Sequence, residues 1–217
     1  MRGRARFIDA KTIEVDTNAS EKQSFTAKRI LIAVGGYPSR LPISGAEYGI
    51  TSDDFFDLEM VPRKVAVVGG SYVAIELAGV MAALRTEVHM FTRGDTLLSK
   101  FDPMIAKRTN EIHEAIGIHV HKRYGSFKEV QRIDGRMGQQ KLLKLIQDDG
   151  SEYEVNELLW AIGRKPEIED LDLDALSLNL SRSGHVAVDE YQNTSVEGVY
   201  EIGDVSRQAH LTPGMPA

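Results

Sequence analysis

The sequence predicts an α/β fold organised around one strand–helix–strand unit, and three neighbouring patterns support this. Lys64–Val68 is a short apolar run that ends at a glycine turn, Gly69-Gly70-Ser71. Apolar residues then recur at helical spacing across residues 72–84, and a second apolar run covers residues 88–92. A strand, a tight turn, a helix and a second strand within about 30 residues form a βαβ unit.

The composition is that of an ordinary globular protein, and it excludes several classes of function. The chain has 217 residues, of which 42% are hydrophobic and 27% charged, with a formal net charge of −6. Its apolar runs fall short of the roughly 18 residues of a membrane span, and its acidic balance argues against a nucleic-acid partner. The chain has no cysteine, so it carries no disulfide, iron–sulfur cluster, thiolate zinc site or thiol chemistry of its own.

The segments before the βαβ unit have the patterns of short strands and loops. Residues 5–8 and 12–15 predict strands, and the polar stretch 16–24 predicts the turn between β segments. The continuous apolar run 29–34 predicts a strand buried on both faces, followed by two glycines. Residues 51–58 predict one or two helical turns.

A second helix and a series of strands follow the βαβ unit. Asp102-Pro103 predicts a helix start, with aspartate as the cap and proline at the first helical position, and Gly117 predicts its end. The apolar positions of the two helices are Val73, Leu77, Val80 and Leu84, and then Ile105, Thr109, Ile112 and Ile116. Further strands are expected at residues 118–121, 127–133, 142–146, 157–162, 185–188 and 199–202.

The glycine turn has the chemistry of a dinucleotide site. A glycine-rich turn between a strand and a helix presents free backbone N–H groups at the positive end of the helix dipole, which suits a pyrophosphate. The fingerprint G-x-G-x-x-G/A falls on residues 69–74. Gly69 and Ala74 fit its first and last positions, whereas Ser71 replaces the middle glycine. The alternative is a turn whose glycines only let the helix and the strand pack tightly.

The end of the second strand bears on the choice of cofactor. NAD sites place an acidic residue there, about 20 residues after the turn, to hold the ribose 2′-hydroxyl. Here the strand ends at Thr92-Arg93. A guanidinium suits a 2′-phosphate, so the sequence favours NADPH over NADH. The alternative is a solvated surface arginine, and the nearby Asp95 weakens the phosphate role.

Several segments together carry a family resemblance. They are residues 30–36 (Ile-Leu-Ile-Ala-Val-Gly-Gly), 50–56, 68–79, 159–164, 189–194 and 200–205. In order and spacing they resemble the glutathione reductase family, within the flavoprotein pyridine nucleotide-disulfide oxidoreductases. Segments 51–56 and 189–194 are the most similar to glutathione and trypanothione reductases, and the match covers nearly the whole chain.

The resemblance implies how the chain would hold NADPH. Tyr72 matches a tyrosine that covers the nicotinamide pocket, and Glu76 matches the carboxylate beside the nicotinamide. Gly70, Val73 and Gly163 match backbone contacts, and Arg93 matches a guanidinium on the 2′-phosphate. With the fingerprint added, the expected NADPH-binding residues are Gly69, Gly70, Ser71, Tyr72, Val73, Glu76, Arg93 and Gly163.

The resemblance also implies FAD as a second cofactor. Asp204 matches the carboxylate that holds the ribityl and phosphate region, and Thr212 matches a residue whose backbone meets the flavin ring. Ala5 and Gly35 fall where family members touch FAD through the main chain.

The implied activity is the reduction of glutathione disulfide by a flavoprotein. Family enzymes pass a hydride from NADPH to FAD, then electrons to a cysteine disulfide and on to glutathione disulfide, as homodimers. The cytoplasm is the expected compartment, with the mitochondrion as the alternative. Trypanothione and dihydrolipoamide reductases are alternatives within the family, although Arg93 disfavours the NADH-using one.

Three positions depart from the family pattern. Ser99, with Lys100 next to it, stands where a second arginine meets the 2′-phosphate. Gly94 stands where a histidine often assists, and Arg85 stands where a glycine ends the helix.

The family's other parts have no counterpart in this chain, which leads us to expect an internal piece of a reductase. The FAD-binding glycine motif, the redox cysteine pair and the interface domain with its His–Glu pair are not found. Residues 61–163 are expected to form a Rossmann-like, three-layer NADPH-binding domain, inserted in a partial FAD-binding domain at residues 1–60 and 164–217. No catalytic residue is expected, so the alternative function is a non-catalytic NADPH-binding chain.

The histidines raise the question of a metal site. His119 and His121 share one face of a strand, and His113 precedes them, but no carboxylate stands at helical ligand spacing from them. Metal ligation requires a fuller set of ligands. We therefore expect structural or exposed histidines and no metal.

Overall fold

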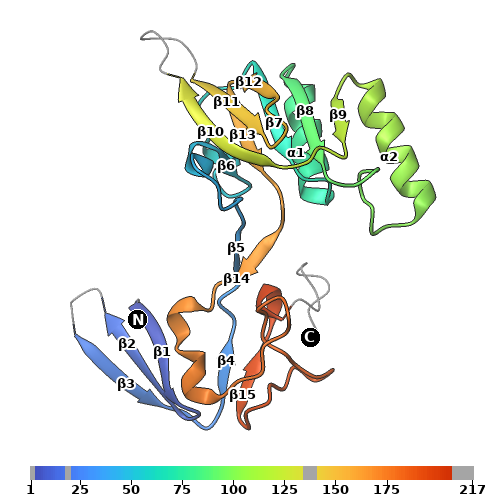
Figure 1. Cartoon of the computed structure of the whole chain (residues 1–217). Helices are drawn as coiled ribbons and strands as arrows, with labels where there is room; N and C mark the ends of the chain where they lie inside the picture. The colour runs from blue at the N-terminus through green and yellow to red at the C-terminus, as the bar shows by residue number, and fades with distance from the viewer. Residues whose placement is uncertain (1–2, 18–20, 134–140, 207–217) are drawn as a thin grey trace. The chain divides into compact units, whose positions relative to one another are not determined.

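The computed structural model describes residues 3–17, 21–133 and 141–206 (Figure 1). The chain divides into two compact units. One contains the described residues up to Tyr37 and from Arg164 onward, and the other is Pro38–Gly163. The second unit therefore includes residues 38–60, which the sequence analysis grouped with the first part of the chain. The assignment of a cofactor to each unit stays a prediction.

The core of the 38–163 unit is a five-stranded parallel sheet. Its strand order is β6 (Ile50–Thr51), β13 (Glu157–Trp160), β7 (Lys64–Val68), β8 (Glu87–Thr92) and β9 (His119–Lys122), with every neighbouring pair parallel. The predicted βαβ unit is confirmed, because β7 leads through α1 (Tyr72–Ala83) to β8. β7 and β13 are apolar after their first residues, Lys64 and Glu157, because both faces of the sheet are covered there.

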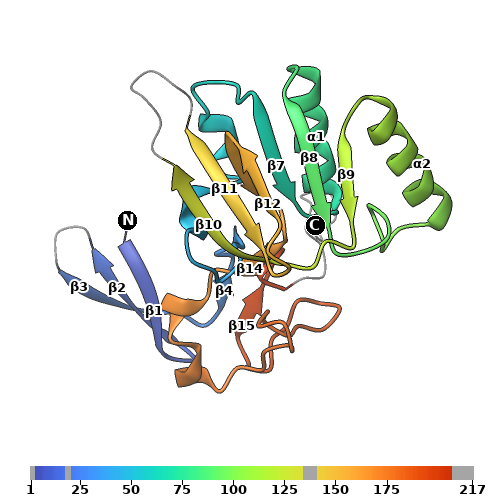
Figure 2. The ribbon, with the colours of Figure 1, turned by 45° about the horizontal axis from the view of Figure 1, so that its top comes forward.

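Two apolar cores cover the two faces of this sheet. On one face, Leu77 and Met81 of α1 pack against Val67. On the other face lies an antiparallel sheet of β10 (Phe127–Ile133), β11 (Leu142–Gln147) and β12 (Glu152–Val155). The fully buried Trp160 belongs to this second core, and its indole N–H donates to the Ala46 carbonyl at 2.8 Å. The helical layer, the parallel sheet and the antiparallel sheet in Figure 2 confirm the predicted α/β class.

Helix α1 buries a different stripe from the one expected. Its buried residues are Ala74, Leu77, Ala78 and Met81. Val80 and Leu84, which keep the helical spacing that predicted α1, are 46% and 53% exposed. The alanines allow the helix backbone to lie close to the sheet, which outweighs the larger apolar side chains on the next face.

Helix α2 (Pro103–Ala115) begins as predicted but also turns a different face inward. Asp102 caps it by accepting a hydrogen bond from the Met104 N–H at 2.8 Å. The buried residues are Ala106, Asn110 and His113, whereas the predicted Ile105, Ile112 and Ile116 are exposed. The buried polar side chains are satisfied by hydrogen bonds, since His113 Nδ1 donates to the Thr109 carbonyl at 2.9 Å. The apolar pattern therefore mispredicted the core face of α2.

Both helices end in a Schellman motif, but only α2 has a glycine at the left-handed position. After α1, the Thr86 N–H donates to the Met81 carbonyl at 3.1 Å and the Arg85 N–H donates to the Ala82 carbonyl at 2.9 Å. Arg85 has φ +65°, and its counterpart after α2, Gly117, has φ +88°. An arginine in this conformation crowds its Cβ against the backbone.

The substitution Arg85→Gly should therefore raise the free energy of unfolding by about 1 kcal/mol. Urea denaturation of the 217-residue chain measures this. The matched control is Gly117→Ala, which places a Cβ at the same helix position and should lower the free energy of unfolding by about 1 kcal/mol. A destabilised Arg85→Gly variant would contradict the backbone strain that we infer at Arg85.

The other unit is built from small sheets. β1 (Gly3–Asp9), β2 (Thr12–Thr17) and β3 (Lys22–Thr26) form an antiparallel sheet, β4 (Ile30–Ile32) pairs in parallel with β15 (Val199–Glu201), and β5 (Gly36–Pro38) pairs with β14 (Arg164–Pro166). Its core gathers Phe7, Ile32, Leu173 and Val205. The short 3-10 helices of the chain are η1 (Ala46–Tyr48), η2 (Phe55–Asp57), η3 (Glu169–Leu171), η4 (Leu173–Leu176) and η5 (Gly203–Val205).

Three strand predictions in this unit are corrected. β3 occupies part of the predicted turn 16–24. The predicted strand 29–34 shrinks to β4, where Leu31 is 55% exposed, so it is not buried on both faces. Residues 185–188 form only an isolated bridge, between Leu180 and Val186. Within the described ranges, no helix has both the length and the apolar character needed to cross a membrane.

Candidate functional site

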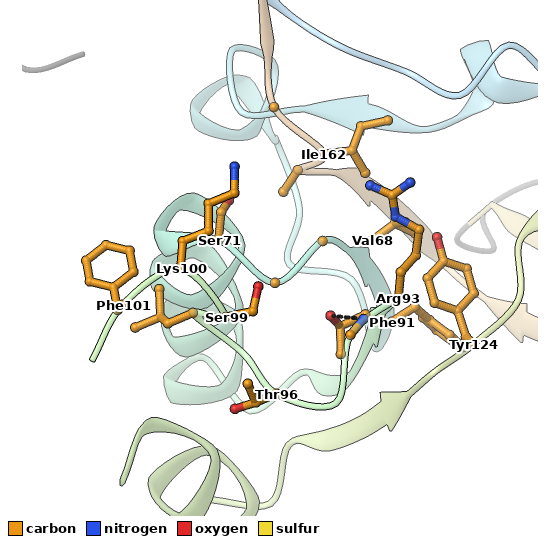
Figure 3. Close-up of a pocket in the computed structure, with 17 residues that line it drawn as sticks. Val68, Ser71, Phe91, Arg93, Thr96, Ser99, Lys100, Phe101, Tyr124 and Ile162 are labelled. Atoms are coloured by element: carbon orange, nitrogen blue, oxygen red, sulfur yellow. Dashed lines mark hydrogen bonds between the residues drawn. The ribbon is translucent and has the colours of Figure 1, made fainter. Parts of the chain in front are cut away.

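A pocket of about 330 Å³ lies in the 38–163 unit at the carboxyl ends of β13, β7 and β8 (Figure 3). Its wall consists of Val68, Gly69, Gly70, Ser71, Phe91, Thr92, Arg93, Gly94, Thr96, Leu98, Ser99, Lys100, Phe101, Tyr124, Ala161, Ile162 and Gly163. The chain order reverses at β7, because β8 lies on one side of it and the much later β13 lies on the other. In open parallel sheets ligands bind in the crevice at such a switch point.

The first residue of the turn requires glycine, and the second leaves little room for a Cβ. Gly69 has φ +141°, and a Cβ on it would lie 2.2 Å from the Ala161 carbonyl oxygen. Its N–H donates to the Phe91 carbonyl at 2.9 Å, so the turn is held against both neighbouring strands. A Cβ on Gly70 would lie 2.8 Å from Thr92 Oγ1. The bare backbone therefore forms the pocket floor, where a ligand can approach it closely.

The N-terminus of α1 faces this turn without a side-chain cap. Ser71 is the N-cap residue and has extended backbone geometry, but its hydroxyl caps no N–H of the helix. Asp102 does cap α2. The first N–H groups of a helix have no partner within it. At α1 they remain available to an anion, at the positive end of the helix dipole.

The described part of the pocket carries two cations and no acid. Arg93 and Lys100 line it, and neither forms an ion pair among the described residues. No aspartate or glutamate is among the described residues of its wall. Asp95, which the sequence placed near Arg93, instead forms an ion pair with Arg123. In a chain of formal net charge −6, this local excess of positive charge favours an anionic ligand.

Tyr124 is a pocket residue that the sequence analysis missed. It is 9% exposed and lies beside Arg93 (Figure 3). Burial raises the pKa of the Tyr124 phenol, and the Arg93 guanidinium opposes that change. A neutral aromatic wall therefore flanks the guanidinium. No motif marks this tyrosine, because it comes from the loop after β9 and meets β8 only in the fold.

Asn110 of α2 holds the loop that carries Lys100, and it was also missed. Its Oδ1 accepts the Leu97 N–H at 3.4 Å, and its Nδ2 donates to Thr96 Oγ1 and to the Ala106 carbonyl. Asn110 is only 7% exposed, so these hydrogen bonds fix the loop from behind. Asn110 is thus a positioning residue.

The structure brings part of the predicted cofactor site together. Gly69, Gly70, Ser71, Arg93 and Gly163 line the pocket. Tyr72, Val73 and Glu76 lie in the first turns of α1 but are not part of its wall. Tyr72 is 41% exposed and Glu76 is exposed too, one helical turn further along.

The predicted flavin residues lie in the other unit, at separate places. Ala5 lines a second pocket of about 110 Å³. Gly35 has φ +74°, and its carbonyl accepts the Glu167 N–H at 3.0 Å. Asp204 is 3.6 Å from Arg164 Nε. Thr212 lies outside the described residues.

Comparison with known proteins identifies the family. Residues 2–215 match the sequence profile of the family described as "Pyridine nucleotide-disulphide oxidoreductase". The chain belongs to this family. Among curated members, this pyridine nucleotide-disulphide oxidoreductase chain is 46% identical over 215 residues to "Glutathione reductase" of Schizosaccharomyces pombe and 40% identical over 203 residues to that of Yarrowia lipolytica. The alignments cover 97% and 93% of the chain but 45% and 42% of these relatives, so the chain spans less than half their length.

Solved structures of flavoproteins share the fold. The HOCl-induced flavoprotein disulfide reductase RclA from Escherichia coli superposes with a TM-score of 0.86 at 20% identity, covering 98% of this chain and 47% of that one. LpdA from Mycobacterium tuberculosis gives a TM-score of 0.87 at 23% identity, covering 99% and 47%. At these identities the likeness concerns the fold, and it agrees with the α/β prediction.

Proposed function

We propose that this chain binds NADPH in the pocket of the 38–163 unit, as part of an FAD-containing enzyme that reduces glutathione disulfide. One observation carries the binding proposal. The wall of the pocket combines Arg93, Lys100 and the uncapped start of α1, and its described residues include no acid. The two relatives named glutathione reductase, at 46% and 40% identity, support the substrate.

The residues present fit the phosphates of NADPH. The pyrophosphate would lie on the turn Gly69-Gly70-Ser71, whose two glycines expose the backbone to a ligand. The 2′-phosphate would lie between Arg93 and Lys100. Lys100 would take the role of the second arginine of the family, because this chain has Ser99 at that arginine's position. A volume of about 330 Å³ falls within the range of ligand pockets.

The end of β8 disfavours NADH. NAD sites hold the ribose 2′-hydroxyl with an acidic residue there. The strand ends instead at Thr92, whose hydroxyl accepts the Gly94 N–H at 3.3 Å. The exposed guanidinium of Arg93 follows directly, and it matches a phosphate better than a hydroxyl.

The nicotinamide end is assigned to Tyr72, Val73, Glu76 and Gly163. Tyr72 and Glu76 are exposed and one helical turn apart on α1, so both side chains are free to orient the ring. NADPH supplies a hydride when it is bound. The chain's own groups position the cofactor and favour NADPH over NADH. None of them is proposed to act as an acid, base or nucleophile.

The other unit would form part of the FAD site. Ala5, Gly35, Asp204 and Thr212 are the proposed contacts. The pocket at Ala5, about 110 Å³, is smaller than pockets that hold a whole ligand, so the described residues fit a portion of FAD only. We assign residues 61–163 to the NADPH domain and residues 1–60 and 164–217 to the FAD domain.

The disulfide step belongs to the whole protein, which we propose to be a cytoplasmic homodimer. This chain has no cysteine, and electrons reach a disulfide substrate through a thiolate. The absence of cysteine therefore favours a second function for the 217-residue chain itself. This function is NADPH binding without disulfide reduction.

The substitution Arg93→Ala tests the proposal. The Kd for NADPH should rise by about tenfold to a hundredfold, because one or two charge-assisted hydrogen bonds to the 2′-phosphate are lost. The Kd for NADH should change less than twofold. Calorimetry with NADPH, NADH, 2′,5′-ADP and 5′-AMP measures both effects.

The matched control is Arg108→Ala, on the exposed surface of α2. It should leave all four affinities unchanged. Equal losses for NADPH and NADH in Arg93→Ala would rule out the 2′-phosphate role.

A further inference from the structure

Two neighbouring strands bring three histidines and a glutamate together at the edge of the parallel sheet. Glu87 and His89 lie on β8, and His119 and His121 lie on β9, the edge strand. The parallel register places His89 opposite His119, so their side chains share one face of the sheet. Figure 1 and Figure 2 both show these strands side by side.

The donor atoms of this cluster converge. One donor atom each from Glu87, His89 and His119 lies within 4.8 Å of the other two. His89 Nε2 is 2.8 Å from Glu87 Oε1, and the His89 and His119 rings stack with centroids 4.7 Å apart. We propose that Glu87, His89 and His119 bind a divalent transition-metal ion of the zinc class. This site is independent of the proposed function.

The donor set selects this class of ion. Two imidazoles and one carboxylate suit Zn²⁺ and its neighbours rather than Mg²⁺ or Ca²⁺, which prefer oxygen donors. Tetrahedral bonds of about 2.0–2.2 Å require donors about 3.3 Å apart. Glu87 and His119 are exposed, so small rotations of their side chains close the remaining gap, and a water supplies the fourth ligand.

His121 orients the central ligand. Its Nε2 is 2.9 Å from His89 Nδ1, and its ring stacks on Phe91 with centroids 4.5 Å apart. A metal-bound imidazole usually donates its second N–H to such an acceptor. When a metal takes His89 Nε2, the proton that Nε2 shares with Glu87 leaves to solvent. The His121 Nε2 proton then moves to His89 Nδ1 and His121 takes a proton from solvent at its own Nδ1, so that His89 Nδ1–H donates to His121 Nε2 and both rings stay neutral.

Lys64 of β7 competes with the metal. Its ammonium lies 3.0 Å from Glu87 Oε1, so a bound cation would have to displace it. Lys64 is partly exposed and can move into solvent. Its removal should therefore strengthen metal binding, which distinguishes a metal site from a purely structural cluster.

The site is far from the nucleotide pocket. Glu87 begins β8, whereas Arg93 follows its last residue, and a strand of this length spans about 20 Å. A metal at the first end should not compete with a ligand at the second.

Zinc titration of the 217-residue chain, free of added histidines and stripped of metal, tests the proposal. Competition with a chromophoric chelator should give one Zn²⁺ per chain. His119→Asn and Glu87→Gln should each weaken binding at least tenfold, and Lys64→Gln should strengthen it at least twofold. Co²⁺ in place of Zn²⁺ should give the visible absorption of a tetrahedral N/O site.

The matched control is Glu114→Gln, an exposed carboxylate on α2 that pairs with Lys122. It should leave zinc affinity unchanged. The far-UV circular dichroism spectrum and the urea unfolding midpoint should be the same in every variant, which shows that each one is folded. Equal zinc affinity in the wild type and His119→Asn, or unchanged or weaker affinity in Lys64→Gln, would overturn the site.

Discussion

The substitution Gly69→Ala should lower the free energy of unfolding of the 38–163 unit by about 4 kcal/mol and abolish NADPH binding. A Cβ at this position would lie 2.2 Å from the Ala161 carbonyl oxygen, a backbone atom that cannot rotate away. The backbone angle, φ +141°, adds conformational strain for any residue except glycine. Overpacking and strain each cost about 1–3 kcal/mol. Urea denaturation followed by the fluorescence of Trp160, the single tryptophan of the chain, reports on this unit.

Two companion substitutions separate folding from binding. Gly79→Ala, within α1, adds a Cβ that meets no atom within 4 Å, and it should stabilise the unit by about 0.5–1 kcal/mol because alanine favours a helix. Gly70→Ala places its Cβ 2.8 Å from the Thr92 hydroxyl, a side chain that can turn away. It should change stability by less than 1 kcal/mol and still weaken NADPH binding at least tenfold. A Gly70→Ala chain with full affinity would show that the bare turn is not the phosphate site.

The sequence predicted the parts of the site that local chemistry determines. The turn Gly69-Gly70-Ser71, its strand and its helix follow one another along the chain, so their spacing alone predicts an anion site. Arg93 was found in the same way, because its position at the end of β8 follows from the βαβ unit. The two cations of the pocket and the glycine floor agree with that reading.

The parts that were missed depend on which strands and side chains meet. Asp95 was expected to weaken the role of Arg93, but it pairs with Arg123, from the loop after β9. His119 and His121 were judged to lack a carboxylate, because ligand spacing was sought along one element. Glu87 enters only through the parallel pairing of β8 with β9, whose register no local pattern specifies.

The buried face of α2 could not be predicted from the sequence for a different reason. The apolar stripe of α2 at Ile105, Ile112 and Ile116 has the correct period, but the helix buries Ala106, Asn110 and His113. The two buried polar side chains, Asn110 and His113, are satisfied by hydrogen bonds that the fold supplies. Hydropathy scores polar side chains as surface residues and cannot register hydrogen bonds that only the fold supplies.

Glu201 leads to the second large prediction, a loss of stability as the pH rises. It lies on β15 and is 0% exposed. Burial raises the pKa of Glu201 from 4.5 to about 7, and the hydroxyl and backbone N–H of Ser206 oppose this change. The folded unit therefore holds a proton that the unfolded chain releases between these two values, so stability falls as the pH rises from about 4.5 to 7 and is constant above that range. The full difference corresponds to about 3 kcal/mol.

The substitution Glu201→Gln should remove this pH dependence, because an amide stays neutral. At pH 8 the variant should be more stable than the wild type by up to about 3 kcal/mol, and near pH 4.5 the two should be similar. Trp160 lies in the other unit, so the measurement is hydrogen exchange at the amides that join β4 and β15, such as the Ile202 N–H that donates to the Ile32 carbonyl. Glu197→Gln, an exposed carboxylate just before β15, is the matched control and should keep the wild-type pH dependence. An unchanged pH dependence in Glu201→Gln would mean that this carboxylate is charged in the folded chain, with a partner that compensates its burial.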